Sequence, residues 1–278
     1  MRDVTIATAL PRQDCGRHRQ LRLFFVQDYL RLMRGRVALL LWAIIIYALL
    51  FVPLIMNGPQ EELVRALASW LGGADIGRKT ILFVWVDATM NKLAVILGPV
   101  LAGGIIVDEK ARGSYDLFLS KAVGAGDYFT VKLAAASAAL ATFYLGAAAG
   151  ALIIFPWAVT SFDAGDFLAL SAVHLFAALF SATFAGLMAV VFASRLTGML
   201  VSIVVLATLV GFAFLGFYYP AYRAWSYLNP FFNGVVLIGS LDHYGFVDVA
   251  RPILVLIGFN LAAAAIGRQR AITLIERQ

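Results

Sequence analysis

The chain has 278 residues, of which 62% are hydrophobic and only 14% are charged. An average globular domain is about 45–50% apolar and roughly 25% charged, and a water-soluble fold of this length has no interior large enough for the surplus. The composition therefore excludes ordinary soluble, disordered, fibrous and collagen-like proteins and indicates that much of the surface faces lipid. The single cysteine, Cys15, also excludes an internal disulfide framework.

A helix that crosses a bilayer needs about 20 mostly apolar residues, because the hydrocarbon core is roughly 30 Å thick. Six stretches meet this requirement, and only Ser194 and Arg195 separate the fourth from the fifth, which predicts a tight helical hairpin. We expect an all-α integral membrane protein with an N-terminal segment 1–36, a six-span domain 37–267 and a tail 268–278. The expected spans are 37–56, 81–107, 131–155, 167–193, 196–219 and 246–267.

The net charge of +6 reflects the places of Lys and Arg along the chain. These residues are concentrated before the first span, between the second and third spans and after the sixth. Because cytoplasmic loops are enriched in Lys and Arg, we expect both termini in the cytoplasm, in a multi-pass protein of the bacterial inner (plasma) membrane. The charge then needs no nucleic-acid partner. The first span is long enough to remain as an anchor, and we expect no cleavable signal.

The segment Gln20–Arg36 is predicted to be an amphipathic helix. Its apolar side chains form one arc of a helical wheel, and Gln27, Asp28, Arg31 and Arg34 lie opposite. A helix of this kind lies in the headgroup layer of a membrane. Two interpretations stay open, an anchor that orients the first span and a lever beside a cytoplasmic partner.

The connection 108–132 is the most informative part of the sequence. After alternating charges, Gly113-Ser114 provides a turn and a helix N-cap, so we expect a short helix at 115–121. Large apolar side chains on the cytoplasmic side are typical of a docking surface. The alternative is a short interfacial helix that packs beneath its own bundle. The apolar side chains of this helix are Tyr115, Phe118 and Leu119.

This connection resembles a motif of type-2 ABC exporter permeases, in which acidic residues, Gly-Ser/Thr, a hydrophobic stretch and a Ser-Lys/Arg pair follow the second span. Ser120-Lys121 matches the pair, and Ala122 stands where the family usually has proline. The amphipathic N-terminal helix and the sequence Tyr227-Leu228-Asn229-Pro230 are similar to that family as well. The resemblance extends over the whole chain in topology, but its motifs are confined to these segments.

The resemblance implies a permease subunit that couples ATP hydrolysis to export. Its partners would be a cytoplasmic ABC ATPase that binds ATP and Mg, a second copy or a related permease, the lipid bilayer and, as a further candidate, an extracytoplasmic protein. The chain itself would bind no cofactor and no metal. The implied ATPase-coupling residues are Glu109, Gly113, Ser114, Tyr115, Leu117, Phe118, Leu119 and Lys121, and the implied connecting-helix residues are Gln27, Arg31 and Arg34.

Asp87, Asn91 and Lys92 form a strongly polar cluster close to membrane depth. Ionisable groups there are costly, which makes them functional candidates. Asp87 and Asn91 are four residues apart and share a helix face. If the span begins near Thr89, Asp87 lies at the outer interface and Lys92 reaches back to it; otherwise the cluster lines a transport path. An ion-coupled secondary transporter that uses Asp87 and a non-transporting assembly factor are the alternative functions.

Two segments are expected on the outer side. Pro59–Leu71 is predicted to be a short amphipathic helix. The aromatic segment Pro220–Gly245 is predicted to be an interfacial or re-entrant hairpin, because irregular backbone at membrane depth must be buried in protein. The family resemblance implies an outer gate here, with Asn229, Pro230 and Phe231, and the alternative is an aromatic interface belt.

Sequence signals of an enzyme are missing. Gly72–Thr80 resembles a phosphate-binding loop, but Arg78 occupies the place where the motif requires Lys. Neither the His-Glu-x-x-His motif nor the Gly-x-Ser-x-Gly elbow occurs, and the three histidines lie far apart. We therefore expect a non-catalytic subunit, in which His174 is a packed or interfacial residue.

Overall fold

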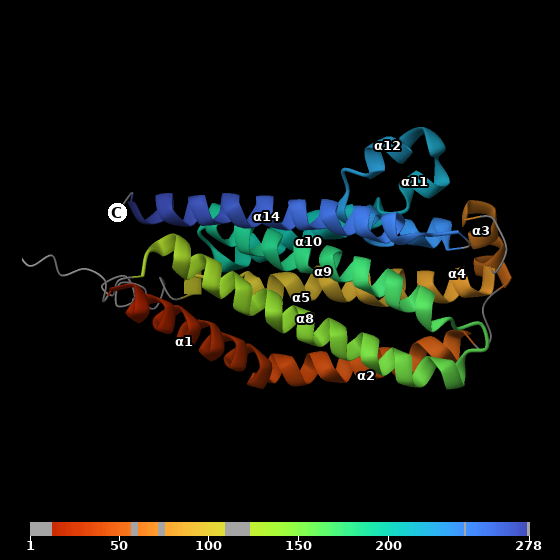
Figure 1. Ribbon diagram of the computed structural model, residues 1–278, viewed down its shortest axis with the longest axis horizontal. Coiled ribbons are helices and arrows are strands. Elements are labelled where there is room, and N and C mark those ends of the chain that lie inside the picture. Colours follow the sequence, from red (N-terminus) through yellow and green to blue (C-terminus); the bar gives the residue numbers. More distant parts are fainter. Residues whose placement is uncertain (1–12, 57–60, 72–75, 109–122, 242, 277–278) are drawn as a thin grey trace, which may run out of the picture.

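The computed structural model describes residues 13–56, 61–71, 76–108, 123–241 and 243–276, and this part of the chain contains helices and turns but no strand (Figure 1). Six of its helical segments are long and apolar enough to cross a membrane, which confirms the predicted all-α fold with six spans. Spans 1 to 6 are α2 (Arg36–Met56); α4 (Ile76–Phe83) with the π-helical η1 (Val84–Asn91) and α5 (Lys92–Ala102); α8 (Ala125–Ala158); α9 (Ala164–Phe192); α10 (Arg195–Gly211) with α11 (Leu215–Tyr218); and α14 (Phe246–Glu276).

Spans 2 and 4 form the interior of the bundle. The central helix α9 packs against α5, α8, α10, α13 and α14. In the most apolar part of each span, 71% of the residues of span 2 and 61% of those of span 4 are buried, compared with 17% in span 6. The apolar side chains of spans 1, 5 and 6 are therefore largely exposed, as expected for helices that face lipid or another membrane protein.

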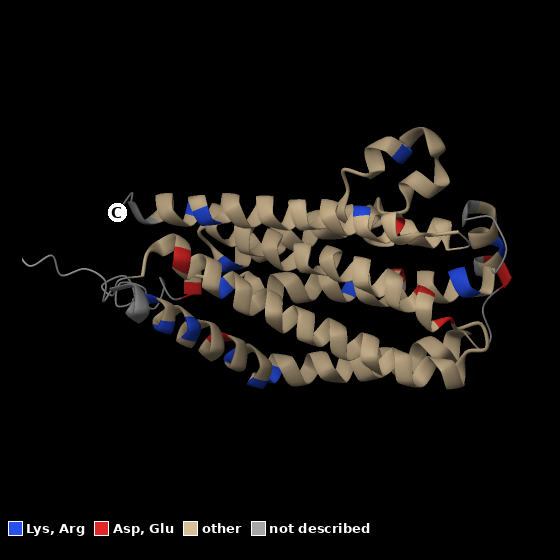
Figure 2. Ribbon diagram, viewed as in Figure 1, with Lys and Arg blue, Asp and Glu red and all other residues tan. Residues whose placement is uncertain are grey.

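The first and last described residues lie at the same end of the bundle. Helix α1 (Gln13–Arg34) begins there and α14 ends there (Figure 1). Lys and Arg gather along α1, so we call this the basic end (Figure 2). The opposite end carries α3 (Glu61–Leu71), which confirms the short helix predicted at Pro59–Leu71.

The second span begins and ends earlier than predicted. The expected range was 81–107, whereas the helical segment is Ile76–Ala102. Its first turns include Arg78, whose guanidinium lies 3.2 Å from the carboxylate of Asp166 on α9. A hydropathy average along the sequence does not take into account that the charge of Arg78 is neutralised by a residue of another helix. The segment ends before Gly103-Gly104, because two consecutive glycines disfavour helix.

Several other helices depart from their expected ranges. Helix α14 continues to Glu276, beyond the expected end of the sixth span at 267, and Arg268 pairs with Asp127 at the start of α8, 3.5 Å away. Helix α8 begins at Ala125 rather than 131, and α1 spans Gln13–Arg34 rather than Gln20–Arg36. Packing at the basic end thus extends helices beyond their apolar cores.

The predicted hairpin between spans 4 and 5 is confirmed. Ala193 adopts a left-handed conformation with φ of 48°, and Ser194 caps α10, its hydroxyl oxygen accepting from the Thr197 amide at 3.4 Å. Span 5, expected to be continuous over 196–219, is interrupted between Gly211 and Leu215.

Candidate functional site

Of the polar cluster of span 2, Asp87 and Asn91 lie on the π-helical segment η1, and Lys92 begins α5. The helical segment begins at Ile76, so Asp87 and Asn91 lie within it and not at its first turn. The two interpretations of Asp87, at the outer interface or lining a path, both stay predictions. π-Helical turns are rare and are frequent at functional sites.

Asp87 and Lys92 line a groove of about 660 Å³ between spans 2 and 5. The walls are mostly apolar and include the aromatic rings of Phe83 and Phe214, and Tyr218 adds a hydroxyl group. A carboxylate and an ammonium thus share an apolar groove beside a spanning helix. Charged groups at such positions typically mark a substrate or ion pathway.

Lys92 also borders a second groove, of about 370 Å³, between spans 1 and 2. Its side chain is exposed, as is that of Ile96, which borders both grooves. Tyr47 and Thr89 provide the hydroxyl groups of this otherwise apolar lining. Span 2 therefore presents a face that carries Lys92 and that the rest of the described chain leaves open.

A buried polar network lies on the other side of span 2. His174 of α9 is fully buried; its Nε2 lies 2.8 Å from Oδ1 of Asn91, and its Nδ1 lies 3.0 Å from the hydroxyl of Tyr144 on α8. Because Oδ1 of Asn91 can only accept, Nε2 of His174 donates, and Nδ1 accepts from the tyrosine hydroxyl. The network links spans 2, 3 and 4 and confirms that His174 is a packed residue.

Asn91 stands between this network and the groove. Its side chain lies within interaction range of the Asp87 carboxyl group. Its Nδ2 atom is the donor available to that carboxyl group, and it is buried without another hydrogen-bond partner among the residues that the structure describes. Asn91 therefore connects the network to Asp87 through its two amide atoms.

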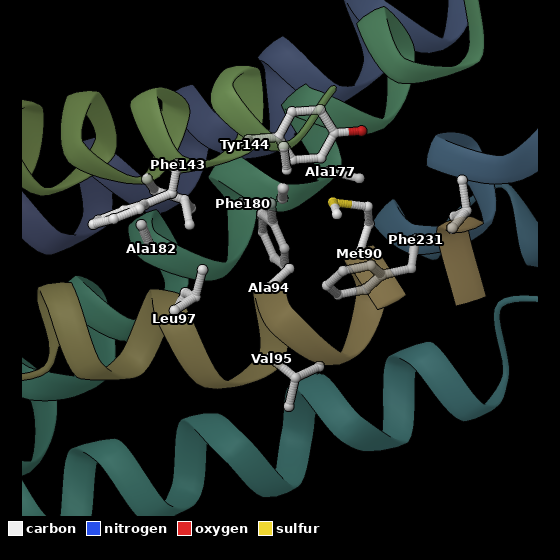
Figure 3. Close-up of a cluster of buried hydrophobic side chains, with 14 of the residues drawn as sticks. Met90, Ala94, Val95, Leu97, Phe143, Tyr144, Ala177, Phe180, Ala182 and Phe231 are labelled. Atoms are coloured by element: carbon white, nitrogen blue, oxygen red, sulfur yellow. The ribbon is translucent and has the colours of Figure 1, made fainter. Parts of the chain in front are cut away.

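The network lies next to a buried cluster of mostly apolar side chains, to which the Tyr144 ring also belongs. Met90, Tyr144, Ala177 and Phe231 come from η1, α8, α9 and α13, and they belong to one buried cluster (Figure 3). In such a low-dielectric interior, hydrogen bonds are strong and unpaired polar groups are costly. The cluster therefore holds Asn91 and His174 in fixed orientations.

The predicted aromatic segment divides into two parts. Helices η2 (Pro220–Tyr222) and α12 (Arg223–Ser226) expose Tyr222 and Trp225, in keeping with an interface belt. Helices α13 (Pro230–Val235) and η3 (Val236–Ser240) instead pack into the bundle, where Phe231 is fully buried. The segment is therefore exposed in its first part and buried in its second, and the outer gate and the interface belt both stay predictions.

Asn229 fixes the start of the inserted helix. Its Oδ1 accepts from the amide of Phe231 at 2.9 Å, and its Nδ2 donates to the carbonyl of Leu209 at 2.7 Å. Pro230 occupies the first helical turn, where its missing N–H has no cost. The predicted gate residues Asn229, Pro230 and Phe231 are therefore buried inside the bundle. They do not line the groove between spans 2 and 5.

Helix α13 packs against Ala177 and the buried His174 of α9. A Cβ atom added to Gly234 of α13 would come within 2.7 Å of the Ala177 Cβ and 3.3 Å of the His174 Cδ2. Only glycine permits this approach. Contacts therefore connect α13 to His174, His174 to Asn91, and Asn91 to Asp87.

At the basic end, α1 is tied to span 3. Gln27, Arg31 and Arg34 are exposed, as predicted for the polar face. Asp28, expected on the same exposed face, is instead buried and pairs with Lys132 of α8 at 2.7 Å. The helix docks on the bundle because this charge and several of its apolar side chains face α8.

The predicted coupling helix, with Glu109, Gly113, Ser114, Tyr115, Leu117, Phe118, Leu119 and Lys121, lies outside the described residues and stays a prediction. The connection leaves the bundle at Asp108, which pairs with Arg195 of α10 at 2.6 Å. This pair anchors the last described residue before the connection to the start of span 5.

Sequence reasoning identified Asp87 and Asn91 but missed Tyr144 and His174 as their neighbours. The available signal was a histidine within an apolar span, which becomes informative only once its partners on other helices are known. The fold and the grooves define a polytopic α-helical membrane protein with a polar site among its spans. No protein-family model matches the chain, and no curated protein is significantly similar to it.

Proposed function

We propose that the chain is the membrane-spanning permease subunit of an ATP-driven ABC exporter, with ATP and Mg bound by a separate cytoplasmic ATPase. The observation that carries the proposal is the groove between spans 2 and 5, where Asp87 and Lys92 stand in an apolar wall. Ionisable groups within spanning helices are costly and typically mark substrate or ion pathways. In this proposal, Asp87 and Lys92 contact the substrate as it passes through the groove.

The ATP-driven part of the proposal is supported by the resemblance of the connection that follows Asp108. The connection begins at the basic end, where Asp28 and Lys132 tie α1 to span 3. A partner ATPase that docks on residues 115–121 would push on this end. The movement couples to transport if nucleotide shifts the balance between two arrangements of the spans.

Orientation and assembly follow from the same features. The concentration of Lys and Arg at the basic end favours a cytoplasmic location for that end, and the bacterial inner membrane for the protein (Figure 2). Only 28% of the most apolar part of span 5 is buried. A second copy, or a related permease, would cover this surface and close the groove into a path.

The test uses the chain co-expressed with a candidate ABC ATPase subunit. We expect the double variant Phe118→Asp/Leu119→Asp to abolish co-purification of the ATPase, and Asp87→Asn to leave co-purification intact while lowering ATP-driven transport. Arg65→Gln, in an exposed pair of α3, is the matched control and changes neither. Intact co-purification and transport in the double variant would exclude the ABC assignment.

An ion-coupled secondary transporter is the second candidate, because Asp87 lies inside span 2 and next to Asn91. Proton or sodium flux into proteoliposomes without ATP distinguishes the two. Under the leading proposal there is no flux without the ATPase. A flux that Asp87→Asn abolishes would establish the second candidate instead.

A further inference from the structure

We propose that the groove between spans 2 and 5 binds an amphipathic molecule whose head carries both an ammonium group and an anionic group. The inference rests on the proposed function and deepens it, because it names the substrate class of the groove that Asp87 and Lys92 line. With a volume of about 660 Å³, the groove has room for such a molecule. Small-molecule sites typically have about 300–1,000 Å³.

The π-helical segment η1 brings the two charges to the same groove. In an α-helix each residue turns by about 100°, so side chains five residues apart point about 140° away from each other. In a π-helix the backbone hydrogen bonds join residues i and i+5, so residues five apart lie on the same side. Asp87 lies in η1 and Lys92 follows its last residue, and both line the groove. The rare backbone conformation therefore places a carboxylate and an ammonium on one wall.

The end of the groove farther from the basic end is aromatic and carries the carboxylate. Phe83 precedes Asp87 by four residues, and its ring centroid lies 4.8 Å from that of Phe214 in span 5. The ring of Tyr218 lines the same end. Aromatic faces attract ammonium groups, and a carboxylate beside them adds a full negative charge. This end of the groove therefore fits the cationic group of a ligand.

The other end of the groove is aliphatic. It is formed by the parts of spans 2 and 5 nearer to the basic end, with Val95, Ile96, Ile203 and Ala207. Along span 2, Lys92 stands between this end and Asp87. A ligand with its cation beside Asp87 therefore presents its anionic group to Lys92 and lays its hydrocarbon along the aliphatic side chains.

Both signs of charge in one apolar groove favour a zwitterion over a singly charged molecule. A zwitterion pairs each side chain with an opposite charge, whereas a single charge leaves either Asp87 or Lys92 against the apolar part of the ligand. Placing a charge against apolar groups in this way costs free energy. The Asp87 carboxylate accepts from Asn91 and from a ligand at the same time, because it has two oxygens.

The experiment measures binding to the full chain in dodecyl maltoside micelles, by equilibrium dialysis against protein-free micelles. The three radiolabelled probes share a dodecyl tail and differ in charge. They are the zwitterion N-dodecyl-N,N-dimethylglycine, the cation dodecyltrimethylammonium and the anion dodecanoate. We expect the zwitterion to bind about tenfold more tightly than either of the others, because it makes one more charged contact.

Variants of the two charged residues should shift the charge preference in opposite directions. Asp87→Asn should weaken binding of the zwitterion and the cation about tenfold and leave dodecanoate unchanged. Lys92→Gln should weaken binding of the zwitterion and dodecanoate to the same extent and leave the cation unchanged. Lys92→Arg keeps the positive charge and should keep the preference of the parent, which separates loss of charge from loss of fold.

A matched pair of substitutions on α10 tests where the tail lies. Ala207 is exposed and lines the aliphatic end, so Ala207→Trp should weaken all three probes about tenfold by filling the space of the tail. Val204 is 64% exposed on the same helix but does not line the groove. Val204→Trp should therefore bind as the parent does.

The outcomes are distinct from those that test the proposed function. Opposite shifts in Asp87→Asn and Lys92→Gln support the proposal. Equal binding of the three probes by the parent, or equal binding by Ala207→Trp and Val204→Trp, would overturn it. The ATPase is absent from this measurement, so a chain that shows the expected order of binding but has no ATPase partner keeps this ligand class and loses the ABC assignment. Intact ATPase co-purification with no preference for the zwitterion refutes the ligand class alone.

Discussion

The carboxylate of Asp28 on α1 lies 2.7 Å from the ammonium of Lys132 on α8, and both side chains are less than one tenth exposed. Lys132 also lies over the ring of Tyr128, with its Nζ 5.1 Å from the ring centroid. The N-terminal amphipathic helix is therefore fixed to the third span by a desolvated ion pair as well as by apolar contacts. Removing one partner of a buried ion pair is strongly destabilising, because the other charge then loses its closest counter-charge.

We predict that Asp28→Asn lowers the free energy of unfolding by about 3–5 kcal/mol, the range observed when one member of a buried pair is removed. Glu61→Gln breaks the exposed Glu61–Arg65 pair of α3 and should cost less than about 1 kcal/mol. Reversible denaturation in detergent measures both. Equal effects of the two substitutions would show that the Asp28 pair is solvated.

The buried network should respond in a graded way. Tyr144→Phe removes one hydrogen bond to His174 and should cost about 1 kcal/mol. His174→Ala leaves both Asn91 and Tyr144 without their partner and creates a cavity, so we expect about 2–5 kcal/mol. The same denaturation measurement applies. The network has no structural role if His174→Ala is no more damaging than Tyr144→Phe.

Gly234 should be intolerant of a methyl group. Gly234→Ala places a Cβ 2.7 Å from that of Ala177, and overpacking of this kind costs about 1–3 kcal/mol. Gly258→Ala on α14 is the control, because nothing lies within 4 Å of the added Cβ, and it should be neutral or slightly stabilising. Ala177→Gly should restore stability to Gly234→Ala. If Ala177→Gly does not restore stability, the loss of stability in Gly234→Ala does not come from the contact with the Ala177 Cβ.

If the groove between spans 2 and 5 is a water-filled path, thiols in it should react with a water-soluble maleimide. In a Cys15→Ser background, Ile96→Cys should be labelled at least tenfold faster than Leu254→Cys, because the thiolate forms in water and not in lipid. Both parent side chains are exposed, 52% for Ile96 in the groove and 66% for Leu254 on α14. Similar labelling rates would indicate that lipid fills the groove.

Hydropathy alone was enough to predict the number of spans and the hairpin at Ser194, because both depend on local composition. It failed wherever a charge was compensated by a distant residue. Arg78 extends span 2 because Asp166 is beside it, and Asp28 is buried because Lys132 faces it. The partners of Asn91 could not be predicted from sequence either, since three helices must pack before His174 reaches it.

A hydrogen bond from Asn229 to the Leu209 carbonyl joins the start of α13 to the interruption of span 5. In a continuous helix the Leu209 carbonyl would accept from the Ala213 amide, but this amide bonds to Val210 instead, and Asn229 donates to Leu209. Because span 5 precedes Asn229 along the chain, the donor that satisfies the open Leu209 carbonyl is synthesised after the helix that it completes.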